Sequence, residues 1–299
     1  MGWCPTSATP SSSALLLAAI LLASCSSAGQ PPEATSTPST RPALARVAQL
    51  KVVNPEPVRS GAAVLSPERE VPTLLQAPSS PGPWGVLVIV HGLGVGPERY
   101  DHLAKLGLEA GLIVLRPSIP QEDPARGFPL DRSVLGRAEP RDLTAVLDAL
   151  RSSAYGRHVD WSRVTVLGHS DGADAALELG FNPLVMDRRV GRVVAMEADP
   201  LDFTPVRNGP WLLVVHADTD ELVPYADGLA VFSAMSGTRT CMATVLGGTH
   251  TDAAWGEGDP PGAAADALIA ELLAARPPYP SRCPRGATPS SLVSLVPAP

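Results

Sequence analysis

A serine lies in the kind of turn that presents a hydroxyl group for chemistry. The pentapeptide Gly-His-Ser-Asp-Gly at residues 168–172 follows an apolar run at 164–167 and precedes a helix-compatible stretch at 173–179. Both glycines suit a sharp turn from strand to helix, because such a turn brings backbone segments too close for a Cβ. The hydroxyl of Ser170 would then stand clear of the backbone as a nucleophile. The pentapeptide also arises by chance in chains rich in Gly and Ser, so the prediction depends on partner residues.

Two later segments supply those partners. A serine becomes a good nucleophile when a histidine accepts its proton and a carboxylate orients that histidine. Asp220 follows the apolar run at 211–215, and His250 ends a glycine-rich loop after the run at 242–246. We therefore predict that Ser170 is the nucleophile, His250 the base and Asp220 the acid.

Several other side chains compete for these roles. Asp218 is the nearest alternative for the acid, although we expect it to bond its own loop backbone. Glu197 and Asp199, which end the preceding apolar run, are further alternatives. The other histidines are expected to satisfy backbone near strand ends (His91, His169 and His216) or to lie at the surface (His102 and His158).

Apolar runs that alternate with helical patterns predict the scaffold for these residues. The expected strands are residues 47–53, 72–76, 85–91, 112–116, 164–167, 193–196, 211–215 and 242–246. The expected helices are residues 98–110, 141–150, 173–179, 226–235 and 263–274. This alternation predicts an α/β fold with a mostly parallel central sheet and helices on both faces. Functional residues should collect at the carboxyl ends of its strands.

Charge and composition narrow the function. The 299 residues carry a net charge of −7 and no basic run, which excludes nucleic acid as the main partner. The six histidines are scattered, with no spacing typical of a metal site, and no glycine-rich phosphate loop opens a helix. We therefore predict no metal and no cofactor, and we expect a monomer.

The N-terminus has the features of an export signal. An apolar run at 14–23 is too short to span a bilayer and ends in Leu-Ala-Ser-Cys at 22–25, which resembles the lipobox of bacterial lipoproteins. The resemblance implies that Cys25 is lipidated. Residues 1–13 lack Lys and Arg, so simple cleavage is the alternative. We expect a signal segment at 1–25, a Ser/Thr/Pro-rich linker at 26–44, and an exported protein, either a bacterial cell-envelope lipoprotein or a secreted one, with only the lipid anchor touching membrane.

Of the four cysteines, Cys4 would be removed with the signal segment and Cys25 would carry the lipid. Cys241 and Cys283 then form an even pair in an exported chain, which favours a disulfide. Cys241 begins the last expected strand, and the helix at 263–274 should run back antiparallel to it. That path carries Cys283 to the same end of the sheet. Two unpaired buried thiols are the alternative. We expect the Pro-rich tail, residues 277–299, to be irregular.

Over residues 45–276 the chain resembles the α/β-hydrolases. The order Ser170, Asp220, His250 is the order of that fold. The segment Asp-Glu-Leu-Val-Pro at 220–224 resembles the Asp-x-x-Val-Pro turn after the family's seventh strand, and His-Gly-Leu-Gly at 91–94 resembles the oxyanion loop after its third strand. The resemblance implies that the backbone N–H groups of Leu93 and Asp171 form an oxyanion hole, with Gly94 replacing Leu93 if the register shifts by one residue.

The Gly-His-Ser elbow is most similar to dienelactone hydrolases, chlorophyllases and bacterial polyester hydrolases. Dienelactone hydrolases use cysteine where this chain has Ser170, so their substrate does not carry over. The resemblance implies a serine hydrolase that cleaves small-molecule or polymeric carboxylic esters through an acyl-enzyme. The alternatives are an acyltransferase or peptidase that uses the same triad, and a non-catalytic exported binding protein of the same fold.

The segments around the predicted site indicate its shape. Residues 199–210, where the family often inserts a cap, are too few for one, so we expect no cap domain. The Pro-rich connection at 117–140 is expected to shape one wall of the site. Trp255, five residues after His250, is the candidate for a wall near the entrance, with simple packing as the alternative.

Overall fold

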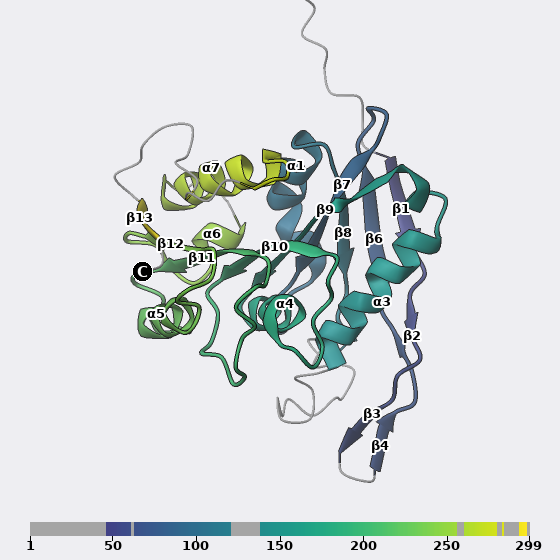
Figure 1. Cartoon of the computed structure of the whole chain (residues 1–299), viewed down its shortest axis with the longest axis horizontal. Coiled ribbons are helices and arrows are strands. Elements are labelled where there is room, and N and C mark those ends of the chain that lie inside the picture. The colour runs from purple at the N-terminus through teal and green to yellow at the C-terminus, as the bar shows by residue number, and fades with distance from the viewer. Residues whose placement is uncertain are drawn as a thin grey trace, which may run out of the picture. The chain divides into compact units, whose positions relative to one another are not determined.

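A nine-stranded sheet forms the centre of the molecule, in the order β1-β6-β8-β7-β9-β10-β11-β12-β13 (Figure 1). The computed structural model describes residues 46–60, 63–120, 138–255, 260–279, 283 and 293–297, all within the unit Pro42–Pro299. The predicted signal segment at 1–25 with Cys25, the linker at 26–44, and residues 121–137 of the Pro-rich connection lie outside the described residues. No helix in the described part of the chain is both long enough and apolar enough to cross a membrane.

The middle of the sheet is parallel. Strands β8, β7, β9, β10, β11 and β12 pair in parallel, whereas β1, β6 and β13 pair antiparallel with their neighbours. Their bounds are β1 (Arg46–Leu50), β6 (Thr73–Ala77), β7 (Trp84–Val90), β8 (Leu112–Pro117), β9 (Val159–His169), β10 (Val190–Met196), β11 (Trp211–Ala217), β12 (Thr240–Val245) and β13 (Val293–Pro297). The predicted α/β class with a mostly parallel sheet is confirmed.

Helices cover both faces of this sheet (Figure 1). On one face, α1 (Asp101–Glu109), α6 (Asp252–Trp255) and α7 (Pro260–Ala274) contribute to one hydrophobic core. On the other, α3 (Ala138–Ser152), α4 (Asp171–Phe181) and α5 (Tyr225–Ala234) contribute to a second core. Two short 3₁₀ helices, η1 (Pro97–Tyr100) and η4 (Gly156–His158), precede α1 and β9.

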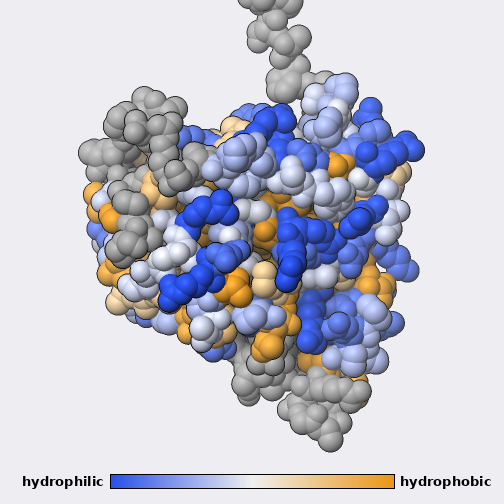
Figure 2. Space-filling view, in the orientation of Figure 1, coloured by the Kyte–Doolittle hydropathy of each residue, from blue (hydrophilic) through white to orange (hydrophobic). Residues whose placement is uncertain are grey.

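The periodicity of the sequence explains these layers. The central strands are buried on both sides, as in β7, where all seven residues are buried; such strands read as continuous apolar runs rather than alternating ones. Helix α3 buries Leu143, Val146, Leu147 and Leu150, which recur at the spacing of one helical face. On the surface, hydrophilic residues are interspersed with smaller apolar areas, as Figure 2 shows for one face.

The expected strand at 47–53 is too long. The strand β1 ends at Leu50, and the chain then forms two small antiparallel pairs, β2 (Val53–Asn54) with β5 (Arg69–Glu70), and β3 (Val58–Ser60) with β4 (Ala63–Ser66). The first pair is tied to α3 by a buried polar cluster, in which the side chains of Asn54 and Arg69 both donate to Asp142. These contacts join residues far apart in sequence, so local periodicity did not predict them.

The prediction that the whole tail is irregular is also wrong. Residues 293–297 form β13, which pairs antiparallel with β12 from Cys241 to Val245. An edge strand such as β12 otherwise presents a row of unpaired N–H and C=O groups. The tail therefore completes the backbone hydrogen bonds of that edge.

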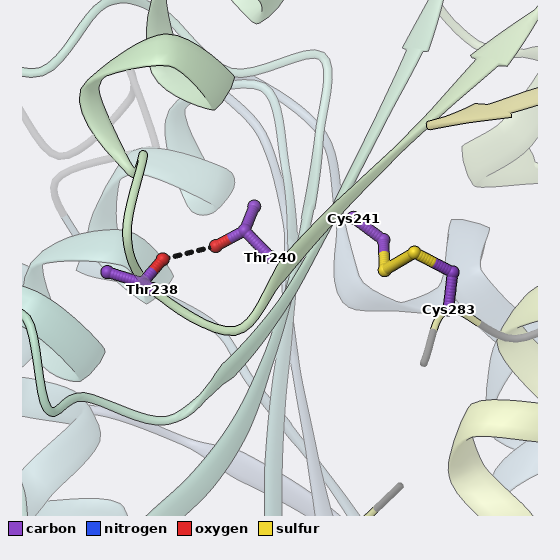
Figure 3. The surroundings of a disulfide bond; sticks show 4 residues. All are labelled: Thr238, Thr240, Cys241 and Cys283. Carbon is purple, nitrogen blue, oxygen red and sulfur yellow. Dashed lines mark hydrogen bonds between the residues drawn. A yellow bond between two sulfur atoms is a disulfide. The ribbon is translucent and has the colours of Figure 1, made fainter. Parts of the chain in front are cut away.

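The predicted disulfide is present between Cys241 and Cys283, with 5.7 Å between their Cα atoms (Figure 3). Cys241 lies at the start of β12, and Cys283 follows α7. The bond attaches the tail to the strand with which β13 pairs. It lies at the opposite end of β12 from the loop that carries His250.

Reducing this disulfide is expected to lower the free energy of unfolding by about 4 kcal/mol, the loop-entropy value for the 42-residue separation of its cysteines. Urea unfolding of the oxidised protein, with and without reductant, measures the loss. The Cys241→Ser/Cys283→Ser variant is the control, since its unfolding should not respond to reductant. Equal midpoints for the oxidised and reduced protein would contradict the prediction.

Candidate active site

Ser170 lies in the sharp turn that the sequence predicts. It connects β9 to α4 with φ 55° and ψ −130°, a left-handed conformation that costs a non-glycine residue about 1–3 kcal/mol. A Cβ on Gly168 would collide with the backbone of Gly172, and one on Gly172 would collide with the backbone of β7. The Ser170 N–H donates to the carbonyl of Met196 at 2.9 Å. The turn is therefore held by the close packing of β7, β9, β10 and α4.

His250 and Asp220 are in direct contact. The Nδ1–H of His250 donates to Oδ2 of Asp220 at 2.7 Å, and both side chains are buried. The other oxygen of Asp220 accepts the N–H groups of Leu222 at 2.8 Å and Val223 at 2.9 Å. Burial alone would raise the pKa of Asp220, but the hydrogen bonds from His250, Val223 and Leu222 outweigh it and hold that pKa below its usual value. The ionised carboxylate keeps the proton of His250 on Nδ1, which leaves Nε2 able to accept one.

A chain of hydrogen bonds places His250 beside the serine turn. The Nε2–H of His169 donates to the carbonyl of His250 at 2.8 Å, and the two rings lie 4.8 Å apart. Nδ1 of His169 accepts the hydroxyl of Tyr100 at 2.9 Å, and that hydroxyl accepts the N–H of Gly92 at 3.1 Å. Burial lowers the pKa of His169 to about 4, so the ring is neutral and its Nδ1 can accept. This series of hydrogen bonds joins the end of β9 to the loops after β7 and β12. Nothing in the sequence marks Tyr100 for this role.

The loop after β7 touches the serine. A Cβ on Gly92 would lie 3.0 Å from the Cβ of Ser170. The N–H of Val95 donates to the carbonyl of Gly92 at 3.2 Å, and Gly94 has φ 68°, so the segment is a tight turn. Leu93 lies within this turn with its side chain partly exposed. Asp171 is the first residue of α4. Asp171 therefore follows Ser170 directly, and Leu93 follows the glycine that lies against Ser170. Their role as oxyanion donors stays a prediction.

The imidazole of His91 is held by backbone. The N–H of Ile119 donates to its Nε2 at 2.9 Å, which leaves the proton on Nδ1 to donate to the carbonyl of Gly92 at 3.0 Å. This bonding agrees with the expected structural role. His158 is exposed, as expected, whereas His102 is half-buried and lies 3.4 Å from Asp266 of α7.

The rival carboxylates have other partners. Asp218 accepts the N–H of Gly247 at 2.6 Å. The sequence predicts a bond to its own loop backbone, whereas this bond goes to the loop that carries His250. Asp199 donates its backbone N–H to the side chain of Asp174 at 3.1 Å. Of the rival carboxylates, only Glu197 lies against Asp220.

Glu197 is fully buried at the end of β10. Both of its carboxyl oxygens lie within hydrogen-bonding distance of the N–H of Ala217, at 3.0 and 3.2 Å, and one of them lies within 4.8 Å of a carboxyl oxygen of Asp220. Burial raises the pKa of Glu197 well above its usual value, and the negative charge of Asp220 raises it further against the opposing effect of the Ala217 N–H. His216 lies 3.4 Å away and donates its Nε2–H to the carbonyl of Val223, while burial lowers its pKa and keeps it neutral.

Carboxylates and imidazoles approach one another in two groups within the described residues. Glu197, His216 and Asp220 form one group, and Asp171, Asp174 and Asp199 form the other, with potential ligand atoms within 4.8 Å in each. The hydrogen bonds above account for the first group. Proximity alone does not make the second a metal site, so the prediction of a metal-free protein stays a prediction.

Trp255 packs against the segment that follows the loop after β7. The guanidinium carbon of Arg99 lies 4.4 Å from the centre of its ring, a distance at which a cation is attracted to the aromatic face. The side chain is half-buried at the end of α6. Its role as a wall near the entrance of the site stays a prediction.

Comparisons with known proteins leave the site to be interpreted from its own geometry. A scan against models of protein families found no match, and a search of curated protein sequences found none either. The geometry supplies a strained serine, a buried His–Asp pair and a glycine turn, all of which follow the carboxyl ends of parallel strands.

Proposed function

We propose that the protein is a serine hydrolase of the α/β-hydrolase type that cleaves carboxylic esters through an acyl-enzyme. The observation that carries the proposal is the 2.7 Å hydrogen bond between His250 and Asp220, beside the strained turn of Ser170. A histidine that is oriented by a carboxylate, next to a serine in a sharp turn from strand to helix, is the arrangement that activates a hydroxyl group.

The topology supports the same family. Counted along the main sheet in chain order, β7 is the third strand and β11 the seventh. The glycine turn that begins at Gly92 follows β7, and Asp220 follows β11, which are the positions that the family resemblance implies for the oxyanion loop and the acid.

The proposed reaction has two steps. The Oγ of Ser170 attacks the ester carbonyl while Nε2 of His250 accepts its proton, and His250 then protonates the departing alcohol. Water attacks the resulting acyl-enzyme by the same route and releases the acid. The N–H groups of Leu93 and Asp171 stabilise the oxyanion in each step, a contribution of about 3 kcal/mol for one such donor.

We further propose that the site is uncapped and the protein exported. Residues 197–210, between β10 and β11, contain no helix or strand, which favours access for bulky or extended esters. The lipobox-like segment that ends at Cys25 favours anchoring of the mature protein in a bacterial cell envelope.

A fluorophosphonate probe tests the proposal directly. It should label the wild-type protein at Ser170 and leave Ser170→Ala unlabelled, because the probe reacts with an activated serine. A chain-length series of p-nitrophenyl esters, with and without a competing alcohol or amine acceptor, then separates hydrolysis from acyl transfer. No labelling of the wild type, or equal labelling of Ser170→Ala, would contradict the proposal.

A further inference from the structure

Glu197 has an unusual backbone directly behind the His250–Asp220 pair. Its φ is 54°, and Ser170 is the only other non-glycine residue with positive φ among the described residues. Its N–H donates to the carbonyl of Val215 at 3.0 Å, which holds this conformation. Strained conformations of this kind persist where the surroundings determine them, and they cluster at functional sites. The strained backbone places a fully buried carboxyl group against Asp220.

The two carboxyl groups need one proton between them. Their oxygen atoms lie within 4.8 Å of one another and both side chains are fully buried, so two negative charges there would repel each other strongly. Asp220 accepts N–H groups from Leu222, Val223 and His250, whereas Glu197 has one close N–H donor, that of Ala217. The proton therefore belongs on Glu197, because the carboxylate that accepts more hydrogen bonds is better stabilised as an anion.

The other groups that face Glu197 favour the same assignment. Asp220, on the loop after β11, and Asp252, in α6, both bring negative charge toward it. His216, on β11, donates to the carbonyl of Val223 and is neutral, and His250 donates to Asp220. None of these groups supplies a positive charge that would stabilise an ionised Glu197.

We propose that Glu197 is a neutral carboxylic acid whose O–H donates to Asp220, and that it is a positioning residue for the Asp220–His250 pair. The donated hydrogen bond offsets the burial of the Asp220 charge and fixes the plane of that carboxylate, which in turn orients the ring of His250. The raised pKa of Glu197 agrees with this state. The effect on turnover rests on the proposed function, whereas the protonation state does not.

The first test measures stability rather than activity. If Glu197 is neutral in the folded protein and ionised in the unfolded chain, the folded state binds one more proton, so wild type loses stability as the pH rises. Glu197→Gln keeps the shape and a donor but does not titrate. The folding equilibrium constant of Glu197→Gln relative to wild type should therefore rise about tenfold per pH unit above the ordinary pKa of glutamic acid, as measured by urea unfolding from about pH 5 to about pH 8. A ratio that does not change with pH would overturn the proposal.

The second test uses ester hydrolysis and a matched pair of variants. Glu197→Met keeps the length of the side chain without a donor and should lower kcat by about tenfold or more, since a hydrogen bond to a buried charge is lost. Glu197→Gln should restore kcat to within about threefold of wild type and leave the acidic limb of the pH–rate profile in place. A shift of that limb to lower pH by about one unit in Glu197→Gln would mean that wild-type Glu197 is ionised, and would overturn the proposal.

The two tests separate this inference from the proposed function. If the protein hydrolyses no ester but the stability ratio rises with pH, the neutral Glu197 stands and the hydrolase proposal fails. If Glu197→Met does not fold, Glu197→Gln alone still decides the protonation state. Equal kcat values for Glu197→Met and wild type would overturn the positioning role.

Discussion

Ser170→Ala is expected to lower kcat for p-nitrophenyl ester hydrolysis by about 10⁶-fold, the loss typical when the nucleophile of such a triad is removed. The protein should remain folded, because the Ser170 side chain makes no capping hydrogen bond to α4 and alanine occupies less space. Initial rates at a high enzyme concentration and saturating substrate measure the loss of kcat. Urea unfolding shows whether the variant is folded.

Ser162→Ala is the matched control for this variant. Ser162 lies on the same strand, β9, near its opposite end, and its exposed hydroxyl bonds Asp160. Its replacement should leave turnover unchanged. Undiminished turnover in Ser170→Ala would assign the reaction to another residue.

Asp220→Asn is expected to lower kcat by about 10⁴-fold, because it reverses the tautomer of His250. The backbone N–H groups of Leu222 and Val223 point at one side-chain oxygen of Asp220 and should retain the amide oxygen of asparagine there. The amide NH₂ would then face Nδ1 of His250, which must accept rather than donate. The proton of the ring moves to Nε2, where it blocks acceptance of the serine proton.

Asp218→Asn distinguishes the acid from its nearest neighbour of the same type. Asp218 contacts the N–H of Gly247 rather than the imidazole, and an amide oxygen can accept the same bond. Its kcat should stay within about tenfold of wild type, since only loop positioning changes. If Asp218→Asn lost as much activity as Asp220→Asn, the assignment of the acid to Asp220 would fail.

The scaffold was predictable because its elements are local and strongly patterned. Buried parallel strands such as β7 and β11 are continuous apolar runs, and α3 repeats its apolar residues at helical spacing. The elements without such a signal were missed. The short pairs β2–β5 and β3–β4 depend on distant partners, and β13 depends on the open edge of β12.

The sequence alone determined where the candidate residues must meet. Ser170, Asp220 and His250 each follow an apolar run, and the carboxyl ends of parallel strands lie at one edge of a sheet, so their encounter follows from topology. The pairing of Cys241 with Cys283 followed from the same antiparallel return of α7, and the structure confirms it.

Only the tertiary structure decided how these residues are held. The hydroxyl of Tyr100 bonds His169 across the sheet edge, and Glu197 reaches Asp220 only because its backbone is forced into a left-handed conformation. No repeating pattern in the sequence predicts either contact. Each depends on the direction of a side chain and on burial by several elements at once. The protonation of a carboxyl group is likewise set by desolvation and neighbouring charge, which exist only after the chain has folded.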